Sequence, residues 1–250
     1  MREFLKRIAN YDIVLIQEVF STPHLPMFCL QKEFRNEATK QGFLYITRGR
    51  QPSLADLIIR KKWTDSGLLI LSKYRFTDTE DIVFEDAAHL DQGAYKGVIF
   101  ARLKISHAHL MVFNCHLQAT HSDGGGKYND IRKRQLLTLR RFIMKKRKKH
   151  PKDSWLLGGD FNVDAIQAAD RIPIEVRNEN PQAEDSPEYV MMLNILNAHE
   201  KMKDLLKLKY GYHPSTRPPR EVISSLTKIF HHKSVQRLDY LFFMEGPGKK

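Results

Sequence analysis

Short apolar runs alternate with segments of helical periodicity along most of the chain. A run of 4–8 apolar residues bounded by turn-forming residues predicts a strand, and apolar positions recurring on one face predict a helix. The predicted strands cover residues 13–16, 44–47, 57–60, 67–72, 98–105, 109–114, 155–157 and 238–243. The predicted helices cover residues 1–9, 24–40, 129–149 and 186–197. Helices that alternate with pairs of strands indicate an α/β or α+β sandwich.

Two stretches lack either pattern. Residues 164–187 are polar and contain proline, and residues 210–233 are irregular and basic. Loops of this length inside a compact domain are usually functional or disordered. Since neither an internal repeat nor a linker interrupts the chain, we expect residues 1–250 to form a single domain.

Composition and charge narrow the class of protein. No run of about 18 apolar residues exists, so no transmembrane segment is expected. Cys29 and Cys115 are the two cysteines, and they read as free core thiols, which favours a reducing compartment. We therefore expect a cytoplasmic or peripheral membrane location. The net charge of +12 predicts attraction to polyanions or to an anionic membrane surface.

The stretch from Trp155 to Asn162 carries the first candidate chemistry. Its apolar strand ends in Gly158 and Gly159, where backbone or ligand can approach closely, and Asp160 follows. On an extended backbone Asp160 and Asn162 would share one side. A carboxylate beside an amide suits the orientation of a water or a phosphate oxygen next to a hard cation. The alternative is turn chemistry, in which both side chains bond to nearby backbone.

Three more polar residues stand at the ends or starts of apolar strands. Glu18 follows residues 13–16 as a magnesium ligand would, although a single glutamate there is more often simply exposed. His116 could donate to a phosphate oxygen, or it could be a satisfied imidazole of the core or the surface. Asp239 needs a partner if it is half-buried. If the partner is Arg237, the pair is structural. If the partner is a catalytic histidine, Asp239 would orient that histidine and keep it basic.

Taken together, these residues resemble the motifs of the endonuclease/exonuclease/phosphatase superfamily, which has the fold of DNase I. The motifs span most of the chain: Gln17-Glu18, Asn114 to Ala119, Gly159 to Asn162, and Arg237 to Tyr240. Within the superfamily the chain is most similar to neutral sphingomyelinases. The similar segments are His116-Leu117-Gln118-Ala119, residues 66–73, Lys96-Gly97, residues 158–163 and residues 186–189.

The resemblance implies a four-layer sandwich, in which two β-sheets pack face to face with helices outside. It also implies Mg²⁺-dependent cleavage of a phosphodiester, with sphingomyelin giving ceramide and phosphocholine. Glu18 would hold Mg²⁺, and Asp160 would orient the attacking water. The remaining implied roles are phosphate binding by His116 and Asn162, pairing with a general-base histidine by Asp239, and substrate contacts by Lys96 and Asn114.

The family pattern also contains elements that the printed sequence does not. The pattern begins with a strand bearing an asparagine near the metal, and it ends with a Ser-Asp-His motif. His231 and His232 precede the last predicted strand and do not occupy the position of that motif. We therefore expect a piece of a longer protein, truncated at both ends.

Two other functions remain open at this point. A nuclease is supported by the net charge of +12. However, the basic run from Arg140 to Lys149 reads as a solvated helix end, and no basic patch interleaved with aromatic residues is present. The third hypothesis is a catalytically incomplete domain that binds a membrane or another partner. The enzyme hypotheses predict that Glu18, His116, Asp160, Asn162 and Asp239 converge on one cleft.

Overall fold

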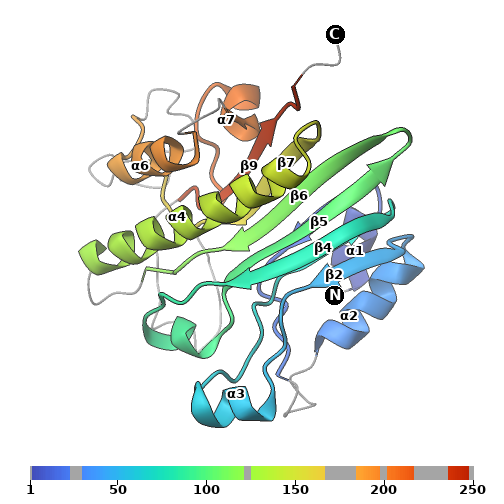
Figure 1. Cartoon of the computed structure of the whole chain (residues 1–250), viewed down its shortest axis with the longest axis horizontal. Coiled ribbons are helices and arrows are strands. Elements are labelled where there is room, and N and C mark those ends of the chain that lie inside the picture. Colours follow the sequence, from blue (N-terminus) through green and yellow to red (C-terminus); the bar gives the residue numbers. More distant parts are fainter. Residues whose placement is uncertain are drawn as a thin grey trace.

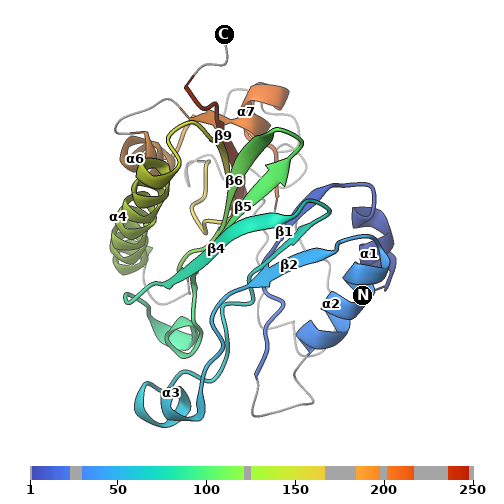
Figure 2. The same cartoon turned by 45° about the vertical axis from the view of Figure 1, so that its right-hand side comes forward.

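The computed structural model describes residues 2–22, 30–120, 125–166, 184–197, 202–216 and 236–247. These residues form two β-sheets that pack face to face between two layers of helices (Figure 1). Figure 2 shows helices α4 (Gly125–Lys149) and α6 (Pro187–Leu196) on one side and helices α1 (Arg2–Ile8) and α2 (Leu30–Lys40) on the other. The predicted four-layer α/β sandwich is therefore confirmed.

The smaller sheet has three antiparallel strands in the order β1-β3-β2. They are β1 (Ile13–Ile16), β2 (Tyr45–Arg48) and β3 (Leu69–Ser72). Successive side chains of a strand point to opposite faces, and both faces of β3 are buried. Leu69 and Leu71 pack in the cluster beneath α1 and α2, whereas Ile70 packs between the two sheets.

The larger sheet has six strands in the order β4-β5-β6-β7-β9-β8. In chain order they are β4 (Phe76–Val83), β5 (Gly97–Ile105), β6 (Ala108–His116), β7 (Ser154–Asp160), β8 (Lys203–Asp204) and β9 (Asp239–Met244). Only the pair β6–β7 is parallel among the pairings of these strands. One face of the sheet is apolar and packs against α4 and α6. The opposite face therefore packs against the smaller sheet.

Strand alternation decides which side chains of β6 face the smaller sheet. Met111, Phe113 and Cys115 belong to the cluster under the helices, while Val112 belongs to the cluster between the sheets. By the same alternation Asn114 and His116 share the inner face with Val112. The apolar pattern of β6 thus places two polar side chains at the interface between the sheets.

The predicted strand at residues 57–60 is wrong. This segment lies in helix α3 (Leu54–Ile59), which a capping box begins: the Ser53 hydroxyl accepts from the Asp56 amide, and the Asp56 carboxylate accepts from the Ser53 amide. The two reciprocal bonds satisfy amides at the helix start, which is why an apolar run becomes helical here.

Sequence patterns also missed four elements. These are β4, β8, the 3₁₀ helix η2 (His89–Gly93) and helix α7 (Leu205–Tyr210). Residues 24–29, most of 164–187 and most of 210–233 lie outside the described residues, as do Cys29, His231 and His232. Cys115 is a buried free thiol, as predicted. Among the described residues, no helix has the length and hydrophobicity that a bilayer crossing requires.

Candidate active site

The ends of three neighbouring strands bring three of the predicted residues together. In the register of the larger sheet, Asp160 of β7 pairs with His116 of β6 on one side and with Asp239 of β9 on the other. Glu18 approaches from the segment after β1 in the smaller sheet. Ligand atoms of Glu18, His116 and Asp160 all lie within 4.8 Å of one another. The structure therefore collects these side chains between the two sheets.

Glu18 owes its position to a left-handed backbone. Its φ angle is 64°, which a non-glycine residue rarely adopts. Gly67 packs against it, and an added Cβ on Gly67 would lie 3.0 Å from the Glu18 Cα atom. The buried Asp65 carboxylate accepts from the amides of Ser21 and Gly67, at 2.9 and 3.0 Å. These bonds fix the segment that presents Glu18.

Asp160 ends β7 and Asn162 lies in the turn that follows, so the two side chains do not share one face of a strand as expected. Asn162 has a φ angle of 50°, and its amide donates to Asp160 Oδ1 at 2.8 Å. The Asn162 side-chain amide donates to the carbonyl of Leu117 at 3.0 Å. Gly159 permits the tight approach, because an added Cβ would lie 2.0 Å from the Cys115 carbonyl oxygen. Turn chemistry thus orients the Asp160 carboxylate.

The electrostatics of the carboxylates favour a bound cation. Burial and then the nearby charges of Asp239 and Glu18 raise the pKa of Asp160 to about 7, although the Asn162 amide and the Lys96 ammonium act in the opposite direction. Burial and the Glu18 charge also raise the pKa of Asp239. Carboxylate oxygens are the ligands that Mg²⁺ prefers, and a divalent ion relieves repulsion between them. Glu18 and Asp160 therefore fit a hard divalent cation.

His116 is buried and pairs with a lysine. Lys96 Nζ lies 3.1 Å from His116 Nε2, and it also donates to the Leu117 carbonyl at 3.1 Å. Burial and the Lys96 ammonium hold the pKa of His116 well below its usual range, so the ring is neutral. A neutral ring that accepts from Lys96 at Nε2 carries its proton on Nδ1, which has no hydrogen-bond partner among the described residues. Lys96, 5% exposed, thus brings the positive charge to this edge of the site.

Asn114 does not reach the site surface, which corrects the expected substrate contact. Its side chain is fully buried, and its amide donates to the carbonyls of Ile16 and Leu69, both at 2.9 Å. Its oxygen accepts from Gln17 Nε2 at 2.6 Å. Asn114 therefore fastens β6 to the smaller sheet. It also holds Gln17, the residue directly before Glu18.

Asp239 has a partner that the sequence did not suggest. Thr216 hydrogen-bonds to the Asp239 side chain, and its hydroxyl oxygen accepts from the amides of Leu238 and Asp239. Arg237 is structural, as one hypothesis held, but its ion pair is with Asp204 at 2.6 Å and not with Asp239. Its guanidinium also contacts His213 Nδ1 at 2.6 Å.

Sequence reasoning missed three supporting residues: Asp65, Asp91 and Thr216. Asp91 Oδ2 lies 3.0 Å from Lys96 Nζ and accepts from the Ala119 amide at 2.9 Å. Only Asp65 offered a sequence signal, since it precedes the recognised segment 66–73 directly. Asp91 stands in the short helix η2 and Thr216 in an irregular segment, and no periodicity in the sequence marks either residue.

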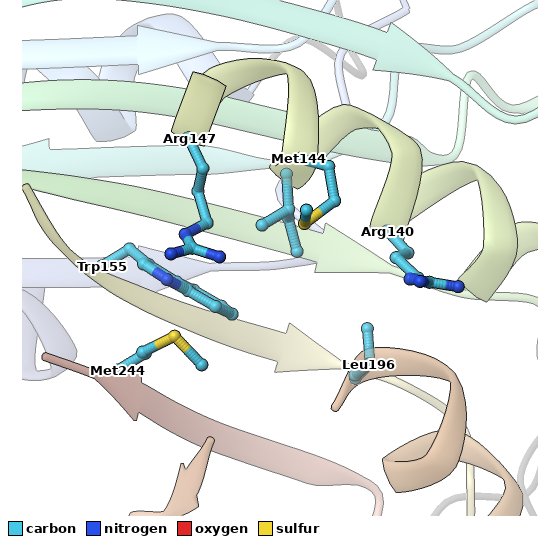
Figure 3. Close-up of a pocket in the computed structure, with 7 residues that line it drawn as sticks. Arg140, Met144, Arg147, Trp155, Leu196 and Met244 are labelled. Atoms are coloured by element: carbon cyan, nitrogen blue, oxygen red, sulfur yellow. The ribbon is translucent and has the colours of Figure 1, made fainter. Parts of the chain in front are cut away.

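A separate pocket lies on the outer face of the larger sheet (Figure 3). Arg140, Met144 and Arg147 project from α4 toward Trp155, Met244 and Leu196. Trp155 precedes Asp160 by five residues on β7, so about 16 Å of strand separates this pocket from the carboxylates. The pocket is therefore not the candidate active site.

Known proteins with similar sequences include sphingomyelinases. A sphingomyelinase of Dictyostelium discoideum is 28% identical over 247 residues, which cover 84% of this chain and 50% of that protein. A sphingomyelinase C of Bacillus cereus is 30% identical over 200 residues, covering 76% of this chain and 54% of that protein. The chain thus spans about half the length of the curated relatives it matches. No family model matches the chain.

Solved structures share the fold across nearly the whole chain. The beta toxin of Staphylococcus aureus with bound magnesium ions has a TM-score of 0.70 and 22% identity, covering 100% of this chain and 77% of that one. SmcL has a TM-score of 0.66 and 18% identity, covering 99% and 76%. TDP2 of D. rerio with single-strand DNA product has a TM-score of 0.58 and 14% identity, covering 98% of this chain and 76% of that one. The resemblance drawn from the motifs is confirmed: the chain belongs to the endonuclease/exonuclease/phosphatase superfamily, where its relatives are sphingomyelinases.

Proposed function

We propose that the protein is a Mg²⁺-dependent phosphodiesterase that hydrolyses sphingomyelin to ceramide and phosphocholine. The observation that carries the proposal is the gathering of Glu18, Asp160 and His116 between the two sheets, with ligand atoms within 4.8 Å of one another. Relatives named as sphingomyelinases support the choice of substrate. The magnesium-bound beta toxin of the same fold supports the choice of ion.

The carboxylates divide between metal binding and water binding. Glu18 would hold Mg²⁺, which when bound supplies positive charge beside the scissile phosphate. Asp160 Oδ1 already accepts from the Asn162 amide, so Oδ2 is the atom that would orient the attacking water. Asp239, held by Thr216, would pair with the group that removes the proton from this water.

Phosphate binding would rest on Lys96, His116 and Asn162. Lys96 carries a positive charge into a mostly buried edge of the site, where charge stabilisation is stronger than in water. Asn162 uses one side-chain N–H on the Leu117 carbonyl and keeps the other for a phosphate oxygen. His116 is neutral and its N–H on Nδ1 is buried, so we propose that it supports phosphate binding by positioning Lys96 through Nε2.

A nuclease is the competing function, favoured by the net charge of +12. Three of the seven basic residues from Arg140 to Lys149 on α4 are in ion pairs, however. Lys145 and Lys146 lie 2.8 Å from the Glu80 carboxylate, and Lys149 lies 2.9 Å from Asp78. These pairs leave less positive charge for a nucleic-acid backbone, which supports the lipid substrate over the nuclease.

The test measures phosphocholine release from sphingomyelin and nicking of supercoiled plasmid, each with Mg²⁺ and with EDTA. We expect Mg²⁺-dependent phosphocholine release. Glu18→Gln should raise the Mg²⁺ concentration for half-maximal activity by about 10-fold or more, because an amide is a poorer Mg²⁺ ligand. Glu245→Gln, a change at an exposed glutamate after β9, is the matched control and should behave as wild type. Plasmid nicking without phosphocholine release would replace this proposal with the nuclease.

A further inference from the structure

Helix α3 has its polarity reversed relative to an ordinary surface helix. Leu54, Ile58 and Ile59 are 60, 71 and 78% exposed, whereas Asp56 is buried. The capping box draws Asp56 inward, and the apolar side chains consequently point to solvent. Scattered exposed apolar residues are ordinary, but an apolar helix face turned outward indicates an interaction surface.

Two more exposed apolar side chains extend this face. Trp63 is 43% exposed and Leu90 of η2 is 75% exposed. The Trp63 amide donates to the Gly93 carbonyl at 3.0 Å, and its ring lies against Gly93, where an added Cβ would come within 1.9 Å. The Trp63 segment therefore packs on η2. We call Leu54, Ile58, Ile59, Trp63 and Leu90 the α3 patch. Both views place α3 at a tip of the molecule, beyond the sheets (Figure 1; Figure 2).

Exposed cations border the α3 patch. Arg60 and Lys61 follow α3 directly, and Arg50 precedes it. Arg60 lies 3.7 Å from Asp56 and is 59% exposed, so a weak surface pair leaves its charge accessible. Apolar side chains that enter acyl chains, with cations at headgroup level, are the chemistry that an anionic lipid surface fits.

The base of the α3 patch is bonded to the candidate active site. Leu90 faces solvent while its neighbour Asp91 contacts Lys96 at 3.0 Å and accepts from the Ala119 amide. On the other side, Asp65 lies two residues after Trp63 and accepts from Gly67, which packs on Glu18. The patch thus shares one rigid frame with the residues that hold Lys96 and Glu18.

We propose that the α3 patch docks on a bilayer that contains anionic lipids and holds the active site at its surface. The inference rests on the proposed function, because it supposes a substrate that lies in a bilayer. Insertion of the apolar side chains supplies the affinity, and Arg50, Arg60 and Lys61 add attraction to anionic headgroups.

The chain's own fluorescence tests the docking without any hydrolysis. Trp63 and Trp155 are the two tryptophans, and Trp155 is buried in the core. Phosphatidylcholine vesicles with phosphatidylserine, without sphingomyelin and in EDTA, should shift the emission to shorter wavelength and sediment the protein. Trp63→Phe should abolish the shift, because it removes the tryptophan that enters the lipid.

Substitutions in the patch measure its contribution. The double change Ile58→Ser and Ile59→Ser should weaken vesicle binding by about 10-fold or more, since each isoleucine loses its apolar burial. Leu208→Ser, at a 69% exposed leucine on α7, is the matched control and should bind vesicles as wild type. Thermal unfolding of each variant checks that folding is unchanged. Wild-type binding by the double variant, or no binding by wild type, would overturn the docking.

Hydrolysis separates this inference from the proposed function. The double variant should lose activity on sphingomyelin in vesicles and retain it on a monomeric short-chain sphingomyelin. Vesicle binding through the patch with no hydrolysis of either substrate would contradict the proposed function and leave the docking supported. Hydrolysis of both substrates with no dependence on the patch would support the function and refute the docking.

Discussion

Asp160 stands directly opposite Asp239 in the antiparallel register of β7 and β9. Like charges placed opposite each other across a sheet are destabilising unless something compensates them. Burial is the largest cause of the raised pKa of Asp160, and the Asp239 charge raises it further. Burial and the Glu18 charge raise the pKa of Asp239. The site therefore stores repulsion that a divalent cation would relieve, which gives the carboxylates a measurable signature in stability.

Asp160→Asn should stabilise the metal-free fold and abolish catalysis. The folded-state pKa of Asp160 is about 7, above its ordinary value of 3.8, so the carboxyl favours the folded state when protonated. Its ionisation lowers the free energy of unfolding progressively from about pH 4 to pH 7. In EDTA at pH 8 the variant should melt several degrees above wild type, at about 2–4 °C per kcal/mol.

Two measurements check this expectation. The difference between the two melting temperatures should disappear below about pH 4, where the carboxyl is protonated in both the folded and the unfolded state. Mg²⁺ should raise the melting temperature of wild type by more than that of the variant, because only wild type has the Asp160 charge that the ion compensates. A variant that melts below wild type at pH 8 in EDTA would show that the carboxylates do not repel.

Thr216→Val should loosen Asp239 and reduce activity. The change removes the hydroxyl that accepts from two backbone amides and bonds to the Asp239 carboxylate. Loss of these bonds should cost about 1–3 kcal/mol of unfolding free energy and lower kcat more than it raises KM. Thr216→Ser keeps the hydroxyl and is the matched control. If the valine variant kept full activity, Asp239 would not depend on this contact.

The sequence predicted some strands and some site residues correctly and missed others, for physical reasons that differ. Buried strands such as β3 and β6 carry continuous apolar runs, so their existence followed from composition and length. Strand β4 did not, because its alternate polar residues include Asp78 and Glu80, whose partners lie on α4, far along the chain. Ion pairs between residues so far apart in the sequence leave no local pattern that predicts a strand.

The positions of Glu18, His116, Asp160 and Asp239 could be expected from strand ends, but their supports could not. The roles of Asp91 and Thr216 depend on the three-dimensional approach of η2 and of the segment after α7 to the larger sheet. Asn114 was misread for a related reason. Its motif placed it next to the site, and only the structure shows its amide bonded to two carbonyls of the smaller sheet.

Lys96→Met should lower kcat strongly while the protein stays folded. The change keeps the length of the side chain and removes the charge that would stabilise the phosphate in the transition state. Loss of one such group commonly costs about 10²–10³-fold in kcat. The pKa of His116 should also rise, because the Lys96 ammonium is one of the two causes that lower it. Imidazole resonances in NMR spectra follow this shift.

Lys104→Met is the matched control, since Lys104 is an exposed lysine at the far end of β5. It should change neither kcat nor the His116 resonances. An unchanged His116 pKa in Lys96→Met would contradict the contact between the two side chains.

Asp78→Asn should weaken the packing of α4 on β4 in a pH-dependent way. Burial alone would raise the pKa of Asp78, but hydrogen bonds and charges from Lys149 and Lys146 lower it to about 2. A carboxyl with a lowered pKa contributes stability above its unfolded-state pKa near 3.8, and this contribution is lost as the pH falls toward 2. The variant should therefore melt below wild type at pH 7, and the two melting temperatures should converge near pH 2.

Asp81→Asn on the same strand is the control with the opposite sign, because burial raises the pKa of Asp81. That variant should melt at or above the wild-type temperature at pH 7, and equal losses in both variants would show that the lysine pairs of Asp78 contribute nothing specific.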